Sequence, residues 1–257
     1  MKIVYGPVSS WRLGSSLGVD LICSKKRICS FNCSYCQLGK PYDLVTKREN
    51  FISINNMKNE LVDALTKTSP DVITFSGTGE PTLANNLNLA INTIRKITKT
   101  PIAILTNSSL LNKIEVRKSL IKIDNVVAKL DAPNEYVFQK INNPAKNINF
   151  KETFEGIKKF KKTYKGKLSI QIMFIKDNFE YASEIANLIK KINPDEIQIN
   201  TPLRPCPVKP LNKNKISKIE KIFQNIGLDT ISVYSSKKPR TSPLDKMELI
   251  KRRRSEM

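Results

Sequence analysis

The sequence predicts an α/β fold, a partial TIM-like (β/α)6 barrel of parallel strands with helices outside. Short, nearly continuous apolar segments alternate with segments whose apolar residues recur at helical spacing, as in a parallel sheet covered by helices. Polar residues follow the apolar segments at the same end each time, and this end of a βα-barrel carries the active site. A flat doubly wound sheet stays open as the alternative, because periodicity alone does not separate the two.

The predicted strands are six apolar segments and a seventh, weaker one. In chain order they cover residues 17–23, 72–76, 102–106, 126–130, 168–175 and 196–200, and more weakly 231–234. Between them, apolar residues at i, i+3, i+4 and i+7 predict helices with ordinary core faces. These residues are Met57, Leu61 and Leu65; Leu87, Ala90, Ile91 and Ile94; Ile185, Leu188, Ile189 and Ile192; and Ile216, Ile219, Phe223 and Ile226.

We expect one core domain at residues 1–236 and a basic C-terminal tail at 237–257. A chain of 257 residues with 40% hydrophobic content is long enough to bury one substantial core. Its apolar stretches fall short of membrane-spanning length, and no export signal precedes them. The prediction is therefore a cytoplasmic protein without a membrane partner, whose oligomeric state the pattern does not encode.

The formal net charge of +21 has two interpretations. A basic excess is typical of proteins that bind nucleic acids, and the densest runs lie at residues 158–162 and 251–254. The chain is also rich in Lys, Asn and Ile, as a compositional bias would produce. A nucleic-acid partner and compositional bias both remain open.

Three cysteines, Cys29, Cys33 and Cys36, lie in one short run, CSFNCSYC. Thiolates are the usual ligands of iron–sulfur clusters, and three of them leave one iron of a four-iron cluster open to a cofactor. Zinc is the alternative, but the chain has no histidine, so zinc would need Cys23, Cys206 or a carboxylate. Three inert buried cysteines are a further alternative.

The lack of histidine also excludes several catalytic mechanisms. It rules out a Ser-His-Asp triad, a Cys-His pair and an H-E-x-x-H zinc site. Residues 14–18 fit G-x-S-x-G, but without a histidine partner this match is accidental. The sequence also has no G-x-x-x-x-G-K-[ST] phosphate-binding loop.

Glycines and polar residues gather where the predicted strands end. Six of the nine glycines fall within the first eighty residues, and Gly77 and Gly79 follow the second predicted strand. Scarce glycines mark positive φ angles or a close approach of the backbone to a ligand. The residues at the strand ends are Gly77, Gly79, Glu80, Asn107, Asp131, Lys176 and Asn200.

With these motifs together, the chain resembles the radical SAM superfamily. The matching residues are the three cysteines with Tyr35 before the last, and Thr78-Gly79-Glu80-Pro81. The segments GPVSSWRLGSSLGVD, CSYCQLG, SGTGEPTL, KLDAP and QINTPLRP are similar to the small Fe–S oxidoreductases grouped with wybutosine (tRNA wyosine) proteins.

The resemblance implies a [4Fe-4S] cluster on Cys29, Cys33 and Cys36 and S-adenosyl-L-methionine as cofactor. It implies reductive cleavage of that cofactor and hydrogen abstraction from an unidentified substrate, with RNA, such as tRNA, as one candidate. It also implies a reductant protein such as ferredoxin or flavodoxin. Tyr35 would lie against the adenine, and Gly79 and Glu80 would contact the methionyl amine. Gly77, Asn107, Asp131 and Asn200 are the remaining candidates for cofactor contacts.

The sequence also departs from the family motif at one position and has two further cysteines. Thr78 stands where the family's G-G-E-P motif has its first glycine, and Gly77 is displaced by one position. Cys23 is expected as a small buried residue inside the first strand, and Cys206 as a loop cysteine between two prolines. A non-catalytic iron–sulfur or zinc protein that binds RNA is the competing interpretation, and no catalytic residue or substrate is predicted.

Overall fold

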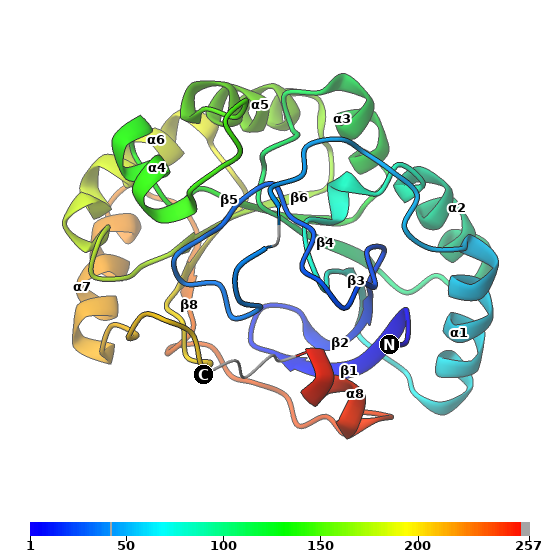
Figure 1. Cartoon of the computed structure of the whole chain (residues 1–257). Helices are drawn as coiled ribbons and strands as arrows, with labels where there is room; N and C mark the ends of the chain where they lie inside the picture. Colours follow the sequence, from blue (N-terminus) through cyan, green and yellow to red (C-terminus); the bar gives the residue numbers. More distant parts are fainter. Residues whose placement is uncertain (42, 253–257) are drawn as a thin grey trace.

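The computed structural model describes residues 1–41 and 43–252. In that part of the chain the strands form one eight-stranded sheet in the order β1-β2-β3-β4-β5-β6-β7-β8. The sheet curls, and helices cover its outer face (Figure 1). The prediction of a partial TIM-like barrel is confirmed. The strands are β1 Val4–Ser10, β2 Gly14–Val19, β3 Val72–Phe75, β4 Ile102–Thr106, β5 Asn125–Lys129, β6 Lys167–Met173, β7 Glu196–Asn200 and β8 Thr230–Ser232.

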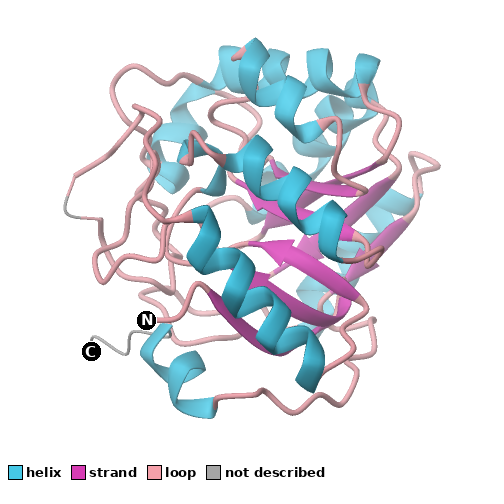
Figure 2. Cartoon of the chain, turned by 90° about the vertical axis from the view of Figure 1, so that its right-hand side faces the viewer, coloured by secondary structure: helices cyan, strands magenta, loops and turns pink. Residues whose placement is uncertain are grey.

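The helices alternate with the strands, and long loops gather at one side of the sheet (Figure 2). Polar caps set several helix boundaries: the side chains of Asn134, Asn149 and Asn212 each accept a backbone N–H of the helix that follows. The helices are α1 Ile54–Lys67, α2 Leu87–Ile97, α3 Ile114–Leu120, α4 Glu135–Asn142, α5 Phe150–Thr163, α6 Ala182–Ile192, α7 Lys213–Gln224 and α8 Lys246–Arg252, with short 3-10 turns η1 Pro81–Leu83 and η2 Phe179–Tyr181.

The strands from β2 to β8 pair in parallel, and β1 pairs antiparallel with β2. Val19 of β2 lies opposite Phe75 of β3, and Phe75 lies opposite Ile104 of β4. This register brings the carboxyl ends of neighbouring strands to one edge of the sheet. The loops after these strands are therefore the ones that form a site.

The start of the sheet differs from the prediction. Strand β1 was not predicted, because its half-buried serines and its proline break the apolar pattern. The predicted strand at 17–23 begins and ends too late, because β2 covers Gly14–Val19. It ends there because the Asp20 side chain accepts the N–H groups of Ile22 and Cys23, which turns the chain out of the sheet. Cys23 lies in this turn with φ 41°, half-buried and outside the strand.

The main core lies between the sheet and the surrounding helices. Strand residues such as Ile73 and Ile170 are fully buried against helix residues such as Leu61, Ile91 and Ile189. The helical stripes that the sequence predicted therefore do face this core. A smaller cluster around Phe31, Tyr35 and Phe138 lies under the cysteine loop.

The segment after β8 returns to the first strand. Leu244 donates its N–H to Gly6 O at 2.7 Å, and the Lys2 N–H donates to the Glu248 carboxylate at 2.9 Å. Arg252 of α8 forms an ion pair with Asp20 at 2.5 Å. Of the basic run predicted at 251–254, Arg253 and Arg254 lie outside the described residues. Among the described helices, none is both long and apolar enough to cross a lipid bilayer.

Candidate functional site

The cysteine loop is held against the loop that follows β3. Ile28 donates its N–H to Thr78 O, and Glu80 donates its N–H to Ile28 O, both at 3.1 Å. The buried guanidinium of Arg27 donates to the carbonyls of Phe31 and Gly39. Arg27 thus ties the middle of the three-cysteine segment to Gly39, which follows it, and the backbone bonds of Ile28 hold the segment to the loop after β3.

Gly77 and Gly79 are required by this close packing. A Cβ at position 79 would lie 1.7 Å from Ile28 O, so only glycine lets the two backbones approach. Gly77 has φ +154°, and a Cβ there would lie 2.1 Å from Cγ of Asp20. Both glycines line the same cavity as Cys36. Their predicted contact with the cofactor stays a prediction, but the structure gives each a packing reason of its own.

Asp20, at the end of β2, organises the start of both loops. One oxygen accepts the N–H groups of Ile22 and Cys23, and the other accepts the N–H and hydroxyl of Thr78, at 2.9–3.0 Å. The Arg252 guanidinium reaches this second oxygen as well. Asp20 is not among the residues predicted from the sequence, because the first predicted strand runs to Cys23. A strand ending at Val19 would have made Asp20 the first polar residue after it.

The Glu80 carboxylate joins the ends of β3 and β4. It accepts the hydroxyls of Thr82 at 2.6 Å and Thr106 at 2.7 Å, and the N–H of Asn107 at 2.7 Å. The side chain is buried, and this burial raises the pKa of Glu80 despite these hydrogen bonds. Glu80 therefore lies beside Asn107 where β3 and β4 end. Its side chain is buried and is not part of the cavity lining.

Two amide side chains point at cysteine sulfurs. Nδ2 of Asn107 lies 3.6 Å from Sγ of Cys29, and Nδ2 of Asn142 lies 3.5 Å from Sγ of Cys33. Burial raises the pKa of the Cys29 thiol to about 12 and raises that of Cys33 too. Positive charge from iron would be needed to hold them as thiolates, and the amide donors suit the sulfurs of a cluster. Asn142, at the end of α4, was not predicted.

Within residues 1–41 and 43–252, no three acidic or cysteine side chains lie close enough to hold a single metal ion. In a four-iron cluster each cysteine binds a separate iron, so the thiolates stand further apart than the ligands of one ion. The donor set, three cysteines on one closed loop with amides beside two of them, fits such a cluster.

Tyr35 and Asp131 form a buried pair under the cysteine loop. The Tyr35 hydroxyl donates to Asp131, whose other oxygen accepts the Met173 N–H at 2.7 Å. Asn142 donates to Asp131 at 2.8 Å, and the Lys129 ammonium lies 4.8 Å from the centre of the Tyr35 ring. Burial raises the pKa of Tyr35 well above its usual value. Tyr35 borders the cavity, whereas Asp131 lies behind it.

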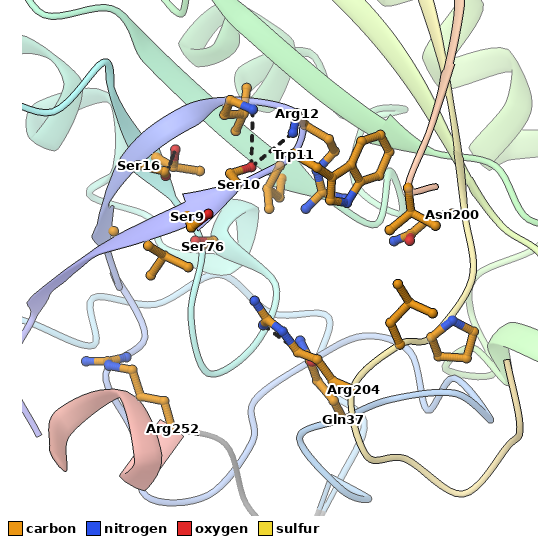
Figure 3. Close-up of a pocket in the computed structure, with 18 of the residues that line it drawn as sticks. Ser9, Ser10, Trp11, Arg12, Ser16, Gln37, Ser76, Asn200, Arg204 and Arg252 are labelled. Carbon is orange, nitrogen blue, oxygen red and sulfur yellow. Dashed lines mark hydrogen bonds between the residues drawn. The ribbon is translucent and has the colours of Figure 1, made fainter. Parts of the chain in front are cut away.

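A cavity of about 420 Å³ lies inside the curled sheet. Of the predicted site residues, Tyr35, Cys36, Gly77, Gly79 and Asn200 line it. Glu80, Asn107 and Asp131 are buried outside this lining, and Cys29 and Cys33 are half-buried outside it. Figure 3 shows Asn200, at the end of β7, on the side of this cavity where Trp11 also lies. The strand-end residues therefore do converge, but in two layers.

The two other cysteines stand apart from this cavity wall. Sγ of Cys23 donates to Lys2 O at 3.4 Å, and Sγ of Cys206 donates to Val208 O at 3.2 Å. Cys206 packs on the smaller cluster that includes Phe31 and Tyr35. Both thiols are thus engaged by backbone carbonyls.

Comparison with known proteins settles the family. The model of the Radical SAM superfamily matches residues 24–189, which include all three cysteines of the loop and the segment around Glu80. The chain belongs to the radical SAM superfamily. It is accordingly a radical SAM enzyme, of a superfamily whose members use S-adenosylmethionine and a [4Fe-4S] cluster and generally need a reductant.

The similar proteins agree with this assignment in sequence and in fold. UPF0026 protein slr1464 of Synechocystis is 41% identical over 207 residues, which are 80% of this chain and 77% of that protein. A radical SAM methyltransferase of Sphaerobacter thermophilus has a similar structure, with a TM-score of 0.63 at 17% identity over 85% of this chain and 66% of that one. At this identity the likeness concerns the fold.

A third relative is longer than this radical SAM chain. The protein named GTPase Obg in Brachyspira hyodysenteriae is 38% identical over 259 residues, which are 97% of this chain but 38% of that protein. The chain therefore spans well under half of this relative.

Proposed function

We propose that this enzyme binds a [4Fe-4S] cluster through Cys29, Cys33 and Cys36 and cleaves S-adenosylmethionine reductively. The observation that carries the proposal is the cysteine loop bonded along its backbone to Thr78 and Glu80, with Cys36 and Gly79 on one cavity wall. When bound, the cluster would supply the electron that splits the cofactor into methionine and a 5′-deoxyadenosyl radical, which takes a hydrogen atom from the substrate.

The residues of the chain would hold and orient these groups. Asn107 and Asn142 would donate to the sulfurs of Cys29 and Cys33, keeping negative charge there favourable. Tyr35 and Asn200, which line the cavity, would contact the cofactor. Glu80 and Asp131 lie behind the wall, so they would act mainly by fixing the loops that meet the cofactor.

Membership of the radical SAM superfamily does not define the substrate of this enzyme. RNA is the first class to test, as the link to wyosine-type proteins and the net charge of +21 suggest. The basic run on α5 is a weak argument for it, because Lys158 pairs with Glu155 at 2.9 Å and Lys161 with Asp195 at 2.7 Å. A ferredoxin or flavodoxin would serve as the reductant.

The test is anaerobic reconstitution with iron and sulfide, followed by reduction in the presence of S-adenosylmethionine and measurement of 5′-deoxyadenosine. We expect product from the wild-type protein and none from variants in which Cys29, Cys33 or Cys36 is alanine. Cluster-loaded protein that leaves the cofactor intact under several reductants would overturn the proposal.

A further inference from the structure

The turn between β1 and β2 brings an aromatic ring and a guanidinium into the cavity. Trp11 and Arg12 occupy this turn, which the Ser10 hydroxyl fixes by accepting the N–H groups of Arg12 at 3.3 Å and Leu13 at 3.1 Å. Both side chains line the cavity, with Arg204 of the loop after β7 across it (Figure 3). Nothing in the proposed cofactor chemistry uses this turn.

The cavity wall is cationic. Arg12, Arg204, Lys238 and Arg252 contribute to it, and the described lining residues include no aspartate or glutamate. Arg252 is neutralised by Asp20 and Glu248. The lining therefore has more basic than acidic side chains, and such an excess attracts anions into the cavity.

Arg12 differs from Arg252 in lacking such a partner. Among the residues that the structure describes, no carboxylate forms an ion pair with Arg12, and its Nε is buried without a hydrogen-bond acceptor. Burial, and then the charge of Arg204, lower the pKa of Arg12 to about 10. Arg12 as a whole is half-buried, and burying part of a charged group without a partner is costly, so an anion that binds there removes this cost.

The turn also lies at the opposite end of β2 from the cysteine loop. Arg12 precedes β2, whereas Asp20, Gly77 and the cysteine loop lie at the other end of that strand. Gly14 and Val19 delimit β2, and at about 3.3 Å per residue these two Cα atoms are roughly 17 Å apart. A cofactor anchored at the cysteine loop therefore leaves the Arg12 end of the cavity for another molecule.

From these observations we infer that the substrate presents an oxyanion, a phosphate or a carboxylate, to Arg12. The planar guanidinium offers parallel N–H donors that match two oxygens of either group. The centroid of the Trp11 ring lies 5.2 Å from the guanidinium carbon of Arg12. This contact holds the guanidinium in place and sets the ring beside the bound group. The inference rests on the proposed function, since it assigns the cysteine end of the cavity to the cofactor.

The chain contains its own reporter for this site, because Trp11 is its only tryptophan. The experiment titrates reconstituted protein, with saturating S-adenosylmethionine present, with inorganic phosphate, adenosine 5′-monophosphate or succinate at constant ionic strength set by chloride. Tryptophan fluorescence is the readout. We expect a saturable change beyond that of chloride; a response to phosphate and the nucleotide identifies a phosphate, and a response to succinate alone identifies a carboxylate.

Matched variants make the test specific to Arg12. Arg12→Gln should weaken the response at least tenfold, and Arg12→Lys should weaken it less, since it keeps the charge but loses the fork. Lys162→Gln, an exposed change of the same net charge, should leave it unchanged. Circular dichroism verifies that each variant is folded, and Arg12→Lys serves as the second test should Arg12→Gln fail to fold.

The inference is overturned if no probe exceeds chloride, if both Arg12 variants respond as the wild type does, or if S-adenosylmethionine abolishes the response by occupying the same site. Wild-type protein that forms 5′-deoxyadenosine without responding to any probe overturns this inference and leaves the proposed function standing. Protein that responds to a probe without cleaving the cofactor supports the oxyanion site and overturns the proposed function.

Discussion

The two ends of the cavity differ in whether their charged side chains have partners within the protein. At the cysteine end, the carboxylates of Asp20, Glu80 and Asp131 are buried, and each accepts several hydrogen bonds from the protein itself. At the hairpin end, Arg12 has a buried Nε without an acceptor and no carboxylate partner in the described chain. The three carboxylates fix the shape of the loops around them, whereas the Arg12 guanidinium has no carboxylate to fix it among the described residues. Residues with partners inside the protein therefore hold the loops in place, whereas we expect Arg12 to contact a bound ligand.

The same comparison bears on the motif around Glu80. The family resemblance assigns Gly79 and Glu80 to the cofactor, but the structure also gives each a role in joining loops. A substitution there is expected to change stability and binding together. Substitutions at the hairpin end are expected to change binding of the substrate without this cost.

The largest effect is expected from the cysteine loop. Cys33→Ala should abolish both cluster iron and 5′-deoxyadenosine, because the cluster loses one of three protein ligands. Cys23→Ala, at a thiol outside the loop, should keep both. Iron and sulfide analysis measures the cluster content of both variants, and the product assay measures their 5′-deoxyadenosine. Full cleavage by Cys33→Ala would remove Cys33 from the ligand set.

The next effect concerns the backbone contact between the two loops. Gly79→Ala should lower the free energy of unfolding by about 3 kcal/mol, since its Cβ would lie 1.7 Å from Ile28 O and the loops must separate. Gly227→Ala, where φ is +77° but nothing lies within 4 Å, should cost only about 1 kcal/mol of backbone strain. Urea unfolding measures both. Equal costs would mean that the contact does not constrain the loop.

Glu80→Gln tests whether a buried carboxylate is needed between β3 and β4. An amide places N–H groups against the donors of Thr106 or Asn107, so we expect about 2 kcal/mol of lost stability. We also expect weaker S-adenosylmethionine binding with cluster content kept. Exposed Glu184→Gln is the control. Equilibrium dialysis with labelled cofactor decides the second point, and unchanged affinity would remove Glu80 from the cofactor site.

The smallest effect is expected at the C-terminal helix. Arg252→Ala should cost about 1.5 kcal/mol, less than the loss of an isolated buried pair, because Asp20 keeps the donors of Ile22, Cys23 and Thr78. Arg240→Ala, an exposed residue of the same tail, should be neutral. Urea unfolding distinguishes them. Identical curves for both variants and the wild type would support a tail, 237–257, that is independent of the core at 1–236.

The architecture was predictable from the sequence because its apolar strand segments alternate with helical stripes along the chain. Strand β4 was predicted with the bounds it has, and the apolar stripes of α2 and α6 face the core as expected. The start of the sheet was harder. Leu21 and Ile22 continue the apolar pattern past β2, although the Asp20 carboxylate, by accepting the Ile22 N–H, has already turned the chain.

The site was predictable only where its residues are local. Cys29, Cys33 and Cys36 share one loop, so their spacing carries the signal. The Asn142 contact with Cys33 joins residues 109 positions apart, and Arg252 reaches Asp20 across 232. No periodicity or spacing encodes such pairs, because they depend on how the curled sheet brings its two edges together.

The central claim is that the cluster on the cysteine loop keeps one iron open for S-adenosylmethionine. Electron paramagnetic resonance of the reduced, reconstituted protein tests it most directly, with spectra recorded before and after the cofactor is added. The account predicts the signal of a reduced [4Fe-4S] cluster that changes when S-adenosylmethionine binds. A spectrum that the cofactor leaves unchanged, or protein that retains no cluster, would contradict it.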